Sequence, residues 1–435
     1  MDKREFKVGI HTLGCKVSQY ESAAIKEKLE ERGYSVCAEI SGCDVIIINT
    51  CTVTAEADRK CASFIRRAAK AGAKVIVCGC YSQINGENIE KSGVVYFCGT
   101  AGKMSVVDAV DAIYNEAVLP SSKIEAPDAY GFEDMKITQF DRTRAYIKIE
   151  DGCDSHCSYC IIPKARGRVR SKHTADVLKE AEYLVENGCK EIVLTGIEVD
   201  AWGKDLDEGN LTDLLESVDA IEGDFRIRLG SLDPFFITED FAIRASRLKK
   251  LAPHFHLSVQ SASSSVLRLM KRRYNAEKLN CAVKLLKKHI DGVMFTCDII
   301  VGFPGETEDD LLQTCEFCER VGFINMHVFP YSERPGTVAS TLSGSVPVFE
   351  RKRRVRRLTE IRDRVKNEAV SQKIFKQKTH RVLVETKTDE GYFAHGGDFV
   401  EFLISADELD IGTFVNVSVD RVENGCCFCS LCDKS

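Results

Sequence analysis

Short β-branched runs alternate with amphipathic segments along the first part of the chain, up to about Glu116. Two segments repeat apolar residues at helical spacing and are followed by a glycine: Val17–Arg32 and Ala55–Ala71. The runs around them have strand length: Val8–Ile10, Val45–Asn49, Val75–Val77 and Val94–Phe97. This alternation predicts a parallel sheet with helices on both faces, in which ligands bind at the carboxyl ends of the strands.

The alternation resumes after residues 119–138, a stretch without periodicity that is predicted as a linker. Helices are predicted at Ala175–Asn187 and Glu308–Val321. Six runs are predicted as strands: Arg144–Ile149, Glu191–Thr195, Arg226–Leu229, His254–Val259, Val293–Val301 and Ile324–Phe329. Six strand–helix units predict a barrel or partial barrel, with function in the loops that follow the strands.

The last part of the chain contains short strands separated by glycine-rich turns, which predicts a small β-barrel. These strands are Arg381–Glu385, Phe399–Leu403 and Phe414–Val419. The chain is therefore predicted to be an α/β protein. Its predicted parts are a parallel α/β domain at residues 4–118, the linker at 119–138, a (β/α) partial barrel at 139–370 and a small β-barrel at 372–435.

A length of 435 residues fits two or three domains. The sequence contains no apolar stretch of about 18 residues and no apolar segment near its first residue. We therefore expect a cytoplasmic protein with no membrane partner. Its 20 cysteines favour metal or redox chemistry, because a reducing compartment keeps thiols from forming disulfides.

Three cysteines lie within eight residues directly after the first predicted barrel strand: Cys153, Cys157 and Cys160. Three thiolates can hold three irons of a [4Fe–4S] cube and leave the fourth iron open. In this C-x3-C-x2-C spacing the open iron usually binds S-adenosylmethionine, whose reductive cleavage releases a 5′-deoxyadenosyl radical. A structural zinc site is the alternative, but such sites are normally closed by four ligands at paired short spacings.

Three other cysteines follow strands of the predicted N-terminal sheet: Cys15, Cys51 and Cys80. Loops at the same edge of a parallel sheet can bring such residues together although they are far apart in sequence. A second three-thiolate site is therefore predicted at this edge. The alternative is three unrelated buried thiols, since cysteine is common in protein cores.

Basic residues concentrate between Val346 and Arg381, where 13 Lys and Arg accompany 4 Asp and Glu, so the rest of the chain carries a net charge of −15. Six of these cations lie within Glu350–Arg357, a density that i,i+4 pairs along one helix do not neutralise. The stretch is predicted to bind nucleic-acid phosphates, with a solvated helix face as the alternative.

Further motifs accompany the cysteines. In the first part they are Thr12–Ser22, Asn49–Thr54 and Gly79–Gln83. In the barrel they are Cys160–Pro163, Arg166–Ser171, Gly230–Pro234, His256–Ser261, Asp298–Thr307 and Tyr331–Thr337. With these motifs the chain resembles the radical S-adenosylmethionine methylthiotransferases. That family joins an N-terminal methylthiotransferase domain, a radical barrel and a C-terminal TRAM β-barrel in this order.

The resemblance implies two [4Fe–4S] clusters, one on each set of three cysteines, with the N-terminal cluster holding the sulfur. It implies two S-adenosylmethionine molecules per turnover, one that methylates the sulfur and one that yields the radical. Cofactor contacts are implied at Gly196, Ser231, Gln260, Gly302 and Gly305. RNA contacts are implied at Arg353, Arg354 and Arg357. No further catalytic residue is assigned.

The implied partners are the anticodon stem–loop of a tRNA, a low-potential electron donor such as flavodoxin or ferredoxin, and a sulfur donor. The segments Gly14–Val17 and Asn49–Thr54 resemble the branch that methylthiolates C2 of N6-threonylcarbamoyladenosine at tRNA position 37. The alternatives are branches acting on isopentenyladenosine in tRNA or on a ribosomal protein. Three residues depart from the family pattern: an acidic Glu198, Trp202 in place of Tyr and Ala262 in place of Gly.

Functions of another class also account for cysteines together with a basic stretch, namely a non-catalytic iron–sulfur electron carrier or a zinc-containing RNA-binding protein. Neither accounts for a six-unit barrel with an incomplete cluster motif. The C-terminal thiols could hold a metal but fit a strand end better: Cys426, Cys427, Cys429 and Cys432. Cys315 and Cys318 are predicted to pack inside a helix–sheet core.

Overall fold

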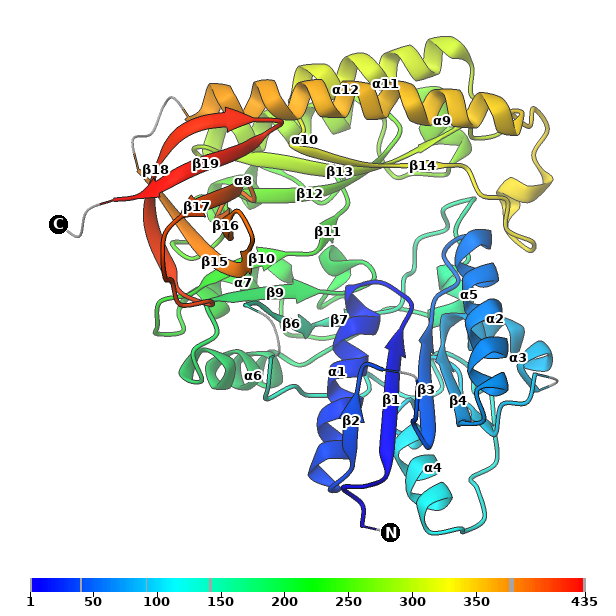
Figure 1. The fold of residues 1–435 in the computed structure, drawn as a ribbon. Helices are drawn as coiled ribbons and strands as arrows, with labels where there is room; N and C mark the ends of the chain where they lie inside the picture. The colour runs from blue at the N-terminus through cyan, green and yellow to red at the C-terminus, as the bar shows by residue number, and fades with distance from the viewer. Residues whose placement is uncertain (1, 40, 91, 141–142, 375–378, 433–435) are drawn as a thin grey trace.

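The computed structural model describes residues 2–39, 41–90, 92–140, 143–374 and 379–432 and arranges them in three parts (Figure 1). Within these ranges, no helix is both long enough and apolar enough to cross a membrane. The predicted α/β class is confirmed, with two parallel α/β parts followed by a closed β-barrel.

The N-terminal part is a five-stranded parallel sheet in the order β2-β1-β3-β4-β5. Its strands are Lys7–Thr12 (β1), Ser35–Cys37 (β2), Val45–Thr50 (β3), Lys74–Gly79 (β4) and Tyr96–Phe97 (β5). The helices are Lys16–Glu31 (α1), Ala55–Lys70 (α2), Cys80–Glu90 (α3) and Ser105–Tyr114 (α4). α1 and α4 pack on one face, and α2 and α3 on the other. Every residue of β3 is buried, as expected for a central strand covered on both faces.

The second part is a partial barrel of parallel strands split into two sheets, β10-β9-β6 and β11-β12-β13-β14. Its strands are Ala145–Lys148 (β6), Glu191–Thr195 (β9), Arg226–Leu229 (β10), Ser231–Leu232 (β11), His254–Gln260 (β12), Met294–Val301 (β13) and Asn325–Pro330 (β14). Gly230 alone separates β10 from β11, so the chain passes directly from one sheet to the other.

Helices follow the barrel strands along the chain: Thr174–Glu186 (α6), Leu211–Asp219 (α7), Glu239–Ala245 (α8), Ser264–Leu269 (α9), Ala276–His289 (α10) and Glu308–Val321 (α11). α11 illustrates how local residues determine where a helix begins and ends. Thr307 and Asp310 form a reciprocal capping box at its start, which satisfies free backbone N–H groups. Gly322 ends it in the left-handed conformation. Three short elements follow β6: Glu150–Asp151 (β7), Ile162–Arg166 (α5) and Arg170–Ser171 (β8).

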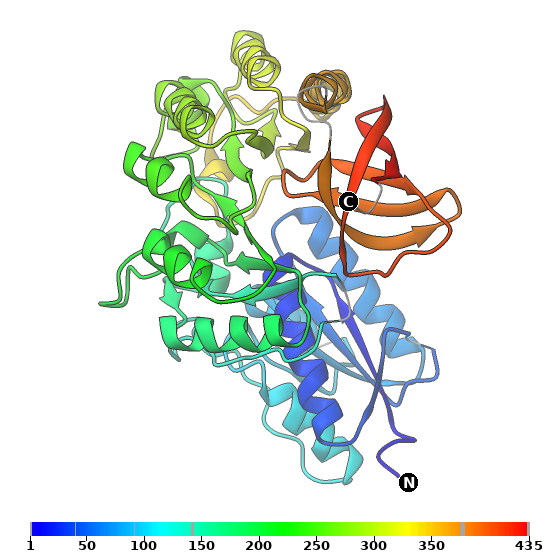
Figure 2. The ribbon, with the colours of Figure 1, turned by 90° about the vertical axis from the view of Figure 1, so that its left-hand side faces the viewer.

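A 27-residue helix, Val348–Ile374 (α12), packs along β14 and α11 and leads to the third part. That part is a closed barrel in the order β15-β16-β17-β19-β18. Its strands are His380–Thr388 (β15), Gly391–Gly396 (β16), Glu401–Ser405 (β17), Phe414–Glu423 (β18) and Cys426–Leu431 (β19). Figure 2 shows this barrel, in orange and red, beside α12. It also touches the partial barrel, where Arg226 donates to the carbonyl of His395 at 3.2 Å.

Candidate active site

The three N-terminal cysteines meet at one edge of the first sheet. Cys15 precedes α1 as its N-cap, Cys51 directly follows β3, and Cys80 is the first residue of α3. Since β1, β3 and β4 are parallel neighbours, their carboxyl ends lie side by side. Burial raises the pKa of the Cys51 thiol to about 12, with a smaller contribution from the nearby Cys80 and Cys15. The structure thus brings the three predicted thiols within electrostatic reach of one another.

Gly79 makes this arrangement possible. Its φ is +100°, and a Cβ at this position would lie 2.6 Å from the carbonyl oxygen of Thr50. Only glycine lets β4 turn into α3 so close to the end of β3. The N-termini of α1 and α3 therefore point their partial positive charge at the thiols, which favours the thiolate form that binds metal.

The three barrel cysteines lie in the loop between β7 and α5. Burial raises the pKa of Cys160 to about 12, with Cys157 adding to the shift. Gly152 precedes this loop with a φ of +89°, and a Cβ there would lie 1.9 Å from the carbonyl oxygen of Arg168. Metal binding must displace protons from these buried thiols, because only the thiolate is a ligand.

The spacing of both thiol sets fits a cube better than a single ion. Among the described residues, one group of three potential ligands has its atoms within 4.8 Å of one another, and it contains no cysteine: His256, Asp298 and His327. A [4Fe–4S] cube carries each thiolate on a different iron, so its sulfur ligands stand farther apart than the ligands of one zinc ion.

Arg166 of α5 contacts the N-terminal thiol site from the second part. Its side chain is fully buried, and its Nε donates to the sulfur of Cys80 at 3.2 Å. Its Nη1 donates to Glu21 of α1 and to Asp151 of β7, each at 2.9 Å. A residue of the second part therefore contacts a predicted ligand of the first.

Two buried lysines complete this network. Lys103 pairs with Glu21, and Lys148 lies 2.8 Å from Asp151. Burial alone would raise the pKa of Glu21, but the cations around it hold that pKa well below its usual range. Three cations therefore accompany two carboxylates in a buried interface. The excess positive charge suits an anionic group on the adjacent thiols. Glu21 and Arg166 both lie in the sequence motifs, but the sequence alone does not show that they contact each other.

Charged side chains also surround the barrel thiols. Arg272 donates to the sulfur of Cys157 at 3.1 Å and pairs with Asp233 at 2.9 Å. Glu198, one of the departures from the family pattern, lies 3.0 Å from the sulfur of Cys153. This mixture of guanidinium and carboxylate groups can bind the amino and carboxylate ends of an amino acid.

A cavity of about 180 Å³ lies between the two parts, next to the barrel thiols. Its walls are formed by the loop after Cys51, by the loop that contains Cys157 and Cys160, and by the ends of β12, β13 and β14. The lining residues are Val53, Thr54, Tyr159, Cys160, Ile161, Ile162, Gln260, Asp298, Ile300, Phe329, Pro330, Tyr331 and Ser332.

The predicted cofactor residues lie at the ends of the barrel strands. Gln260 lines the cavity with a φ of +58°. Ser231 bonds to Ser258 at 2.7 Å, and Gly196 lies where a Cβ would be 2.6 Å from Glu150. A Cβ at Gly302 would strike the side chain of Arg351, 2.4 Å away.

Gly305 has a φ of +83° and donates its N–H to the carbonyl of Gly344 at 2.8 Å. Packing against a helix and a loop therefore accounts for the conformations of both Gly302 and Gly305. Contact between these five residues and the cofactor stays a prediction.

The predicted RNA-binding arginines of α12 have acidic partners in the structure, and their contact with RNA stays a prediction. Arg353 and Arg357 of α12 pair with Glu308 of α11, at 2.6 and 2.8 Å. Arg354 is buried and pairs with Glu306 at 2.7 Å. Glu306 and Glu308 lie more than 40 residues away in the sequence, so a count of i,i+4 pairs along α12 finds for these arginines only Glu350, which pairs with Arg353 and Arg354 at 2.7 and 2.9 Å.

The C-terminal cysteines belong to strand β19 and the residue after it. Cys427 and Cys429 point into the core of the small barrel, and Cys426 lies at its margin. This alternation spreads the thiols over both faces of the strand. Cys315 and Cys318 are buried in the core of the second part, where packing was predicted.

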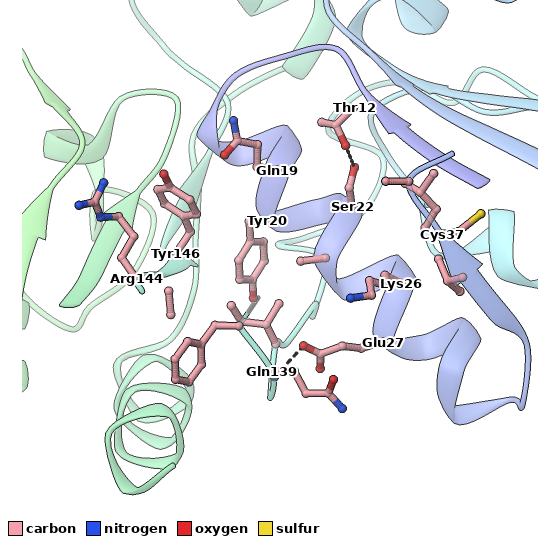
Figure 3. Close-up of a pocket in the computed structure, with 17 residues that line it drawn as sticks. Thr12, Gln19, Tyr20, Ser22, Lys26, Glu27, Cys37, Gln139, Arg144 and Tyr146 are labelled. Atoms are coloured by element: carbon pink, nitrogen blue, oxygen red, sulfur yellow. Dashed lines mark hydrogen bonds between the residues drawn. The ribbon is translucent and has the colours of Figure 1, made fainter. Parts of the chain in front are cut away.

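A larger cavity, of about 450 Å³, separates α1 from β6 (Figure 3). It contains none of the six predicted cluster cysteines. Two pairs of its polar groups bond to each other: Thr12 to Ser22 at 2.7 Å, and the N–H of Gln139 to Glu27 at 2.8 Å. The contact of Glu27 with Gln139 joins α1 to the chain that leads into the second part.

Two family models match the chain. The radical SAM superfamily matches residues 147–318, and an uncharacterised protein family, UPF0004, matches residues 7–99. The threonylcarbamoyladenosine tRNA methylthiotransferase MtaB of Bacillus subtilis is 36% identical over 95% of this chain and 93% of its own length. A tRNA-2-methylthio-N(6)-dimethylallyladenosine synthase of Fusobacterium nucleatum is 34% identical over 95% of this chain and 97% of its own.

Among solved structures, the radical S-adenosylmethionine methyltransferase TsrM of Kitasatospora setae has a TM-score of 0.55. It is 15% identical, over 78% of this chain and 74% of its own. At this identity the likeness concerns the fold alone.

Proposed function

Because the chain belongs to the family of radical S-adenosylmethionine tRNA methylthiotransferases, which use [4Fe–4S] clusters, we propose that it methylthiolates C2 of N6-threonylcarbamoyladenosine at position 37 of tRNA. The observation that supports this most directly is that the two three-thiol sets lie on either side of one interface, with Cys80 and Cys160 within electrostatic reach of each other. We assign one cluster to Cys153, Cys157 and Cys160, and the other to Cys15, Cys51 and Cys80.

The chemistry explains why two sites are needed. C2 of an adenine ring is an unactivated aromatic carbon, and replacing its hydrogen by a methylthio group is beyond general acid–base catalysis. A reduced cluster with bound S-adenosylmethionine supplies a 5′-deoxyadenosyl radical, which can remove that hydrogen. The cavity lies next to the barrel thiols, and Arg272 with Glu198 and Asp233 can orient the amino acid end of the cofactor.

The third part and α12 are proposed to hold the RNA. The anticodon stem–loop would be bound mainly through its phosphates, which position the RNA without reading its sequence. A low-potential electron donor, such as flavodoxin or ferredoxin, and a sulfur donor complete the proposed partners. The t6A branch is supported by relatives named for that nucleoside, at 36% and 38% identity. A relative named for dimethylallyladenosine at 34% makes isopentenyladenosine the alternative to test.

Mass spectrometry of tRNA nucleosides tests the proposal. Cells lacking this gene should lose 2-methylthio-N6-threonylcarbamoyladenosine, accumulate the unmethylthiolated nucleoside and recover on complementation. Complementation with Cys157→Ala is the matched control and should fail. Loss of the methylthiolated isopentenyl nucleoside instead would assign the chain to the other branch.

A further inference from the structure

The inner face of the second barrel sheet is not filled. Barrels of this kind usually pack their interior with layers of side chains. Here alternate residues of β12, β13 and β14 remain accessible to solvent on the face that looks toward the N-terminal part. These residues are His256, Ser258, Gln260, Asp298, Ile300, His327 and Phe329. An accessible inner face next to Cys160 is a surface for a ligand.

Strand register divides this face into a polar and an apolar half. β13 pairs with β14 so that Asp298 lies beside His327 and Ile300 lies beside Phe329. Phe329 is 44% exposed, and Val53 across the cavity is 52% exposed. Two exposed apolar side chains facing one cavity offer a platform for a planar base.

The polar half is a hydrogen-bonded triad. His256 Nε2 lies 3.2 Å from one oxygen of Asp298, and His327 Nδ1 lies 3.1 Å from the other. The second nitrogen of His256 is held by Thr296 at 2.8 Å. With both imidazoles donating to Asp298, Nε2 of the 54%-exposed His327 is left as an acceptor on this face.

Lys16 contributes a cation from the other side. It is the first residue of α1, and the first turn contains no acidic residue. Its positive charge lies at the positive end of the helix macrodipole, so Lys16 destabilises α1 at this position. Burial and the nearby Arg228 and Arg144 lower the pKa of Lys16, whereas Asp298 and Glu191 oppose this shift, so a carboxylate bound here would favour the charged form. Within the described part of the chain, its accessible ammonium forms no hydrogen bond or ion pair.

We propose that this face binds the modified adenosine, with the base on Phe329 and Val53 and the N6-substituent in the polar half. Lys16 pairs with the carboxylate of the substituent, and Nε2 of His327 accepts a hydrogen bond from its hydroxyl group. The inference rests on the proposed function, because the threonylcarbamoyl group has both groups and an isopentenyl group has neither.

Binding of two anticodon stem–loops, one with N6-threonylcarbamoyladenosine and one with unmodified adenosine, tests the site on the full-length protein. Lys16→Met and His327→Phe should each lower the preference for the modified RNA roughly tenfold or more, the loss expected for a hydrogen bond to a charged or buried group. Lys28→Met, an exposed lysine on the same helix, is the control and should keep the preference.

A second test changes the ligand instead of the protein, so its result does not depend on whether a variant folds. Methyl esterification of the substituent's carboxylate should weaken binding to the unmutated protein and have no further effect on Lys16→Met. Equal losses for both RNAs in the variants, or an ester that binds as well as the acid, would overturn the inference.

The triad could instead bind a metal, and metal analysis of Asp298→Asn distinguishes the two roles. A stoichiometric divalent metal other than iron that disappears in this variant would make the triad a metal site and overturn the inference. If the unmutated enzyme methylthiolates the threonylcarbamoyl nucleoside but the variants keep their preference, the inference alone fails. If the unmutated enzyme modifies only another nucleoside, the proposed function fails as well.

Discussion

At the scale of single residues, Arg166 donates hydrogen bonds to groups from both parts of the chain: the sulfur of Cys80 and the carboxylates of Glu21 and Asp151. Arg166→Gln should lower the free energy of unfolding by about 3 kcal/mol, since it removes a buried cation that contacts two buried carboxylates and a thiol. It should also reduce iron retention at the N-terminal thiols. Urea denaturation and iron analysis measure both effects. Arg168→Gln, an 82%-exposed neighbour, is the control and should change neither.

Asp200 is a second residue whose environment predicts a measurable effect. Burial raises the pKa of its carboxyl group to about 7, and the nearby Asp233 and Glu198 contribute. The unfolded chain loses this proton near pH 4, whereas the folded protein keeps it until about pH 7. Stability is therefore lost as the pH rises through this window, by up to about 4 kcal/mol.

Asp200→Asn removes the titrating group and keeps a hydrogen-bond acceptor for the N–H of Asp233. Denaturation of the metal-free protein should show that wild type loses stability relative to this variant between pH 4 and pH 7. A constant difference across that range would contradict the raised pKa.

At the scale of elements, α12 combines two kinds of arginine. Arg354 is buried against Glu306, so Arg354→Gln should cost about 3 kcal/mol of stability, because it leaves a buried carboxylate unpaired. Arg353 and Arg357 pair with Glu308 at the surface, and replacing both with Gln should leave the free energy of unfolding nearly unchanged.

Because Arg353 and Arg357 lie at the surface, they can release Glu308 and bind a phosphate group of the RNA instead. The double variant should therefore bind tRNA more weakly and lower the salt slope of binding by about 1 to 2. Titrations at several salt concentrations measure this slope. An unchanged slope would show that the RNA is held elsewhere.

An aromatic contact joins the small barrel to the second part, in addition to polar contacts such as that of Arg144 with Glu385. Phe399 has a φ of +67° and stacks between His254 and His395, with ring centroids 4.9 and 4.6 Å away. Arg228 lies over the ring at 4.7 Å. Phe399→Ala should weaken this docking by about 2 kcal/mol. Hydrogen exchange at β10 should then become faster. Phe349→Ala, at a 74%-exposed position, is the control and should leave the exchange unchanged.

Elements with strong local signals were predictable from the sequence. α11 has the predicted limits, because its capping box and its terminal glycine are both local. α3 and β2 were not predicted, since α3 begins with polar residues and β2 is a three-residue edge strand. The pairs of α12 and the buried charges around Arg166 also escaped prediction. Their members come from distant segments, and only the packed structure brings them together.

At the scale of the whole molecule, the two thiol sets have separate roles in the proposed reaction, although Arg166 contacts a ligand of one from the domain of the other. Changing Cys153, Cys157 and Cys160 to Ala should leave about half of the iron of the reconstituted protein and abolish 5′-deoxyadenosine formation, because three ligands are needed for each cube. About four irons per chain in the unmutated protein would contradict two clusters.

Changing Cys15, Cys51 and Cys80 to Ala should have a different effect. The barrel thiols approach Arg272 and Glu198, which belong to the second part, so this site should still support cleavage of S-adenosylmethionine. 5′-Deoxyadenosine should therefore still form, whereas no methylthio group should reach the RNA. Anaerobic assays of the nucleoside product by mass spectrometry, with deoxyadenosine measured in the same samples, compare the two triple variants directly. Full methylthiolation by the N-terminal variant would show that its thiols are not needed for the sulfur transfer.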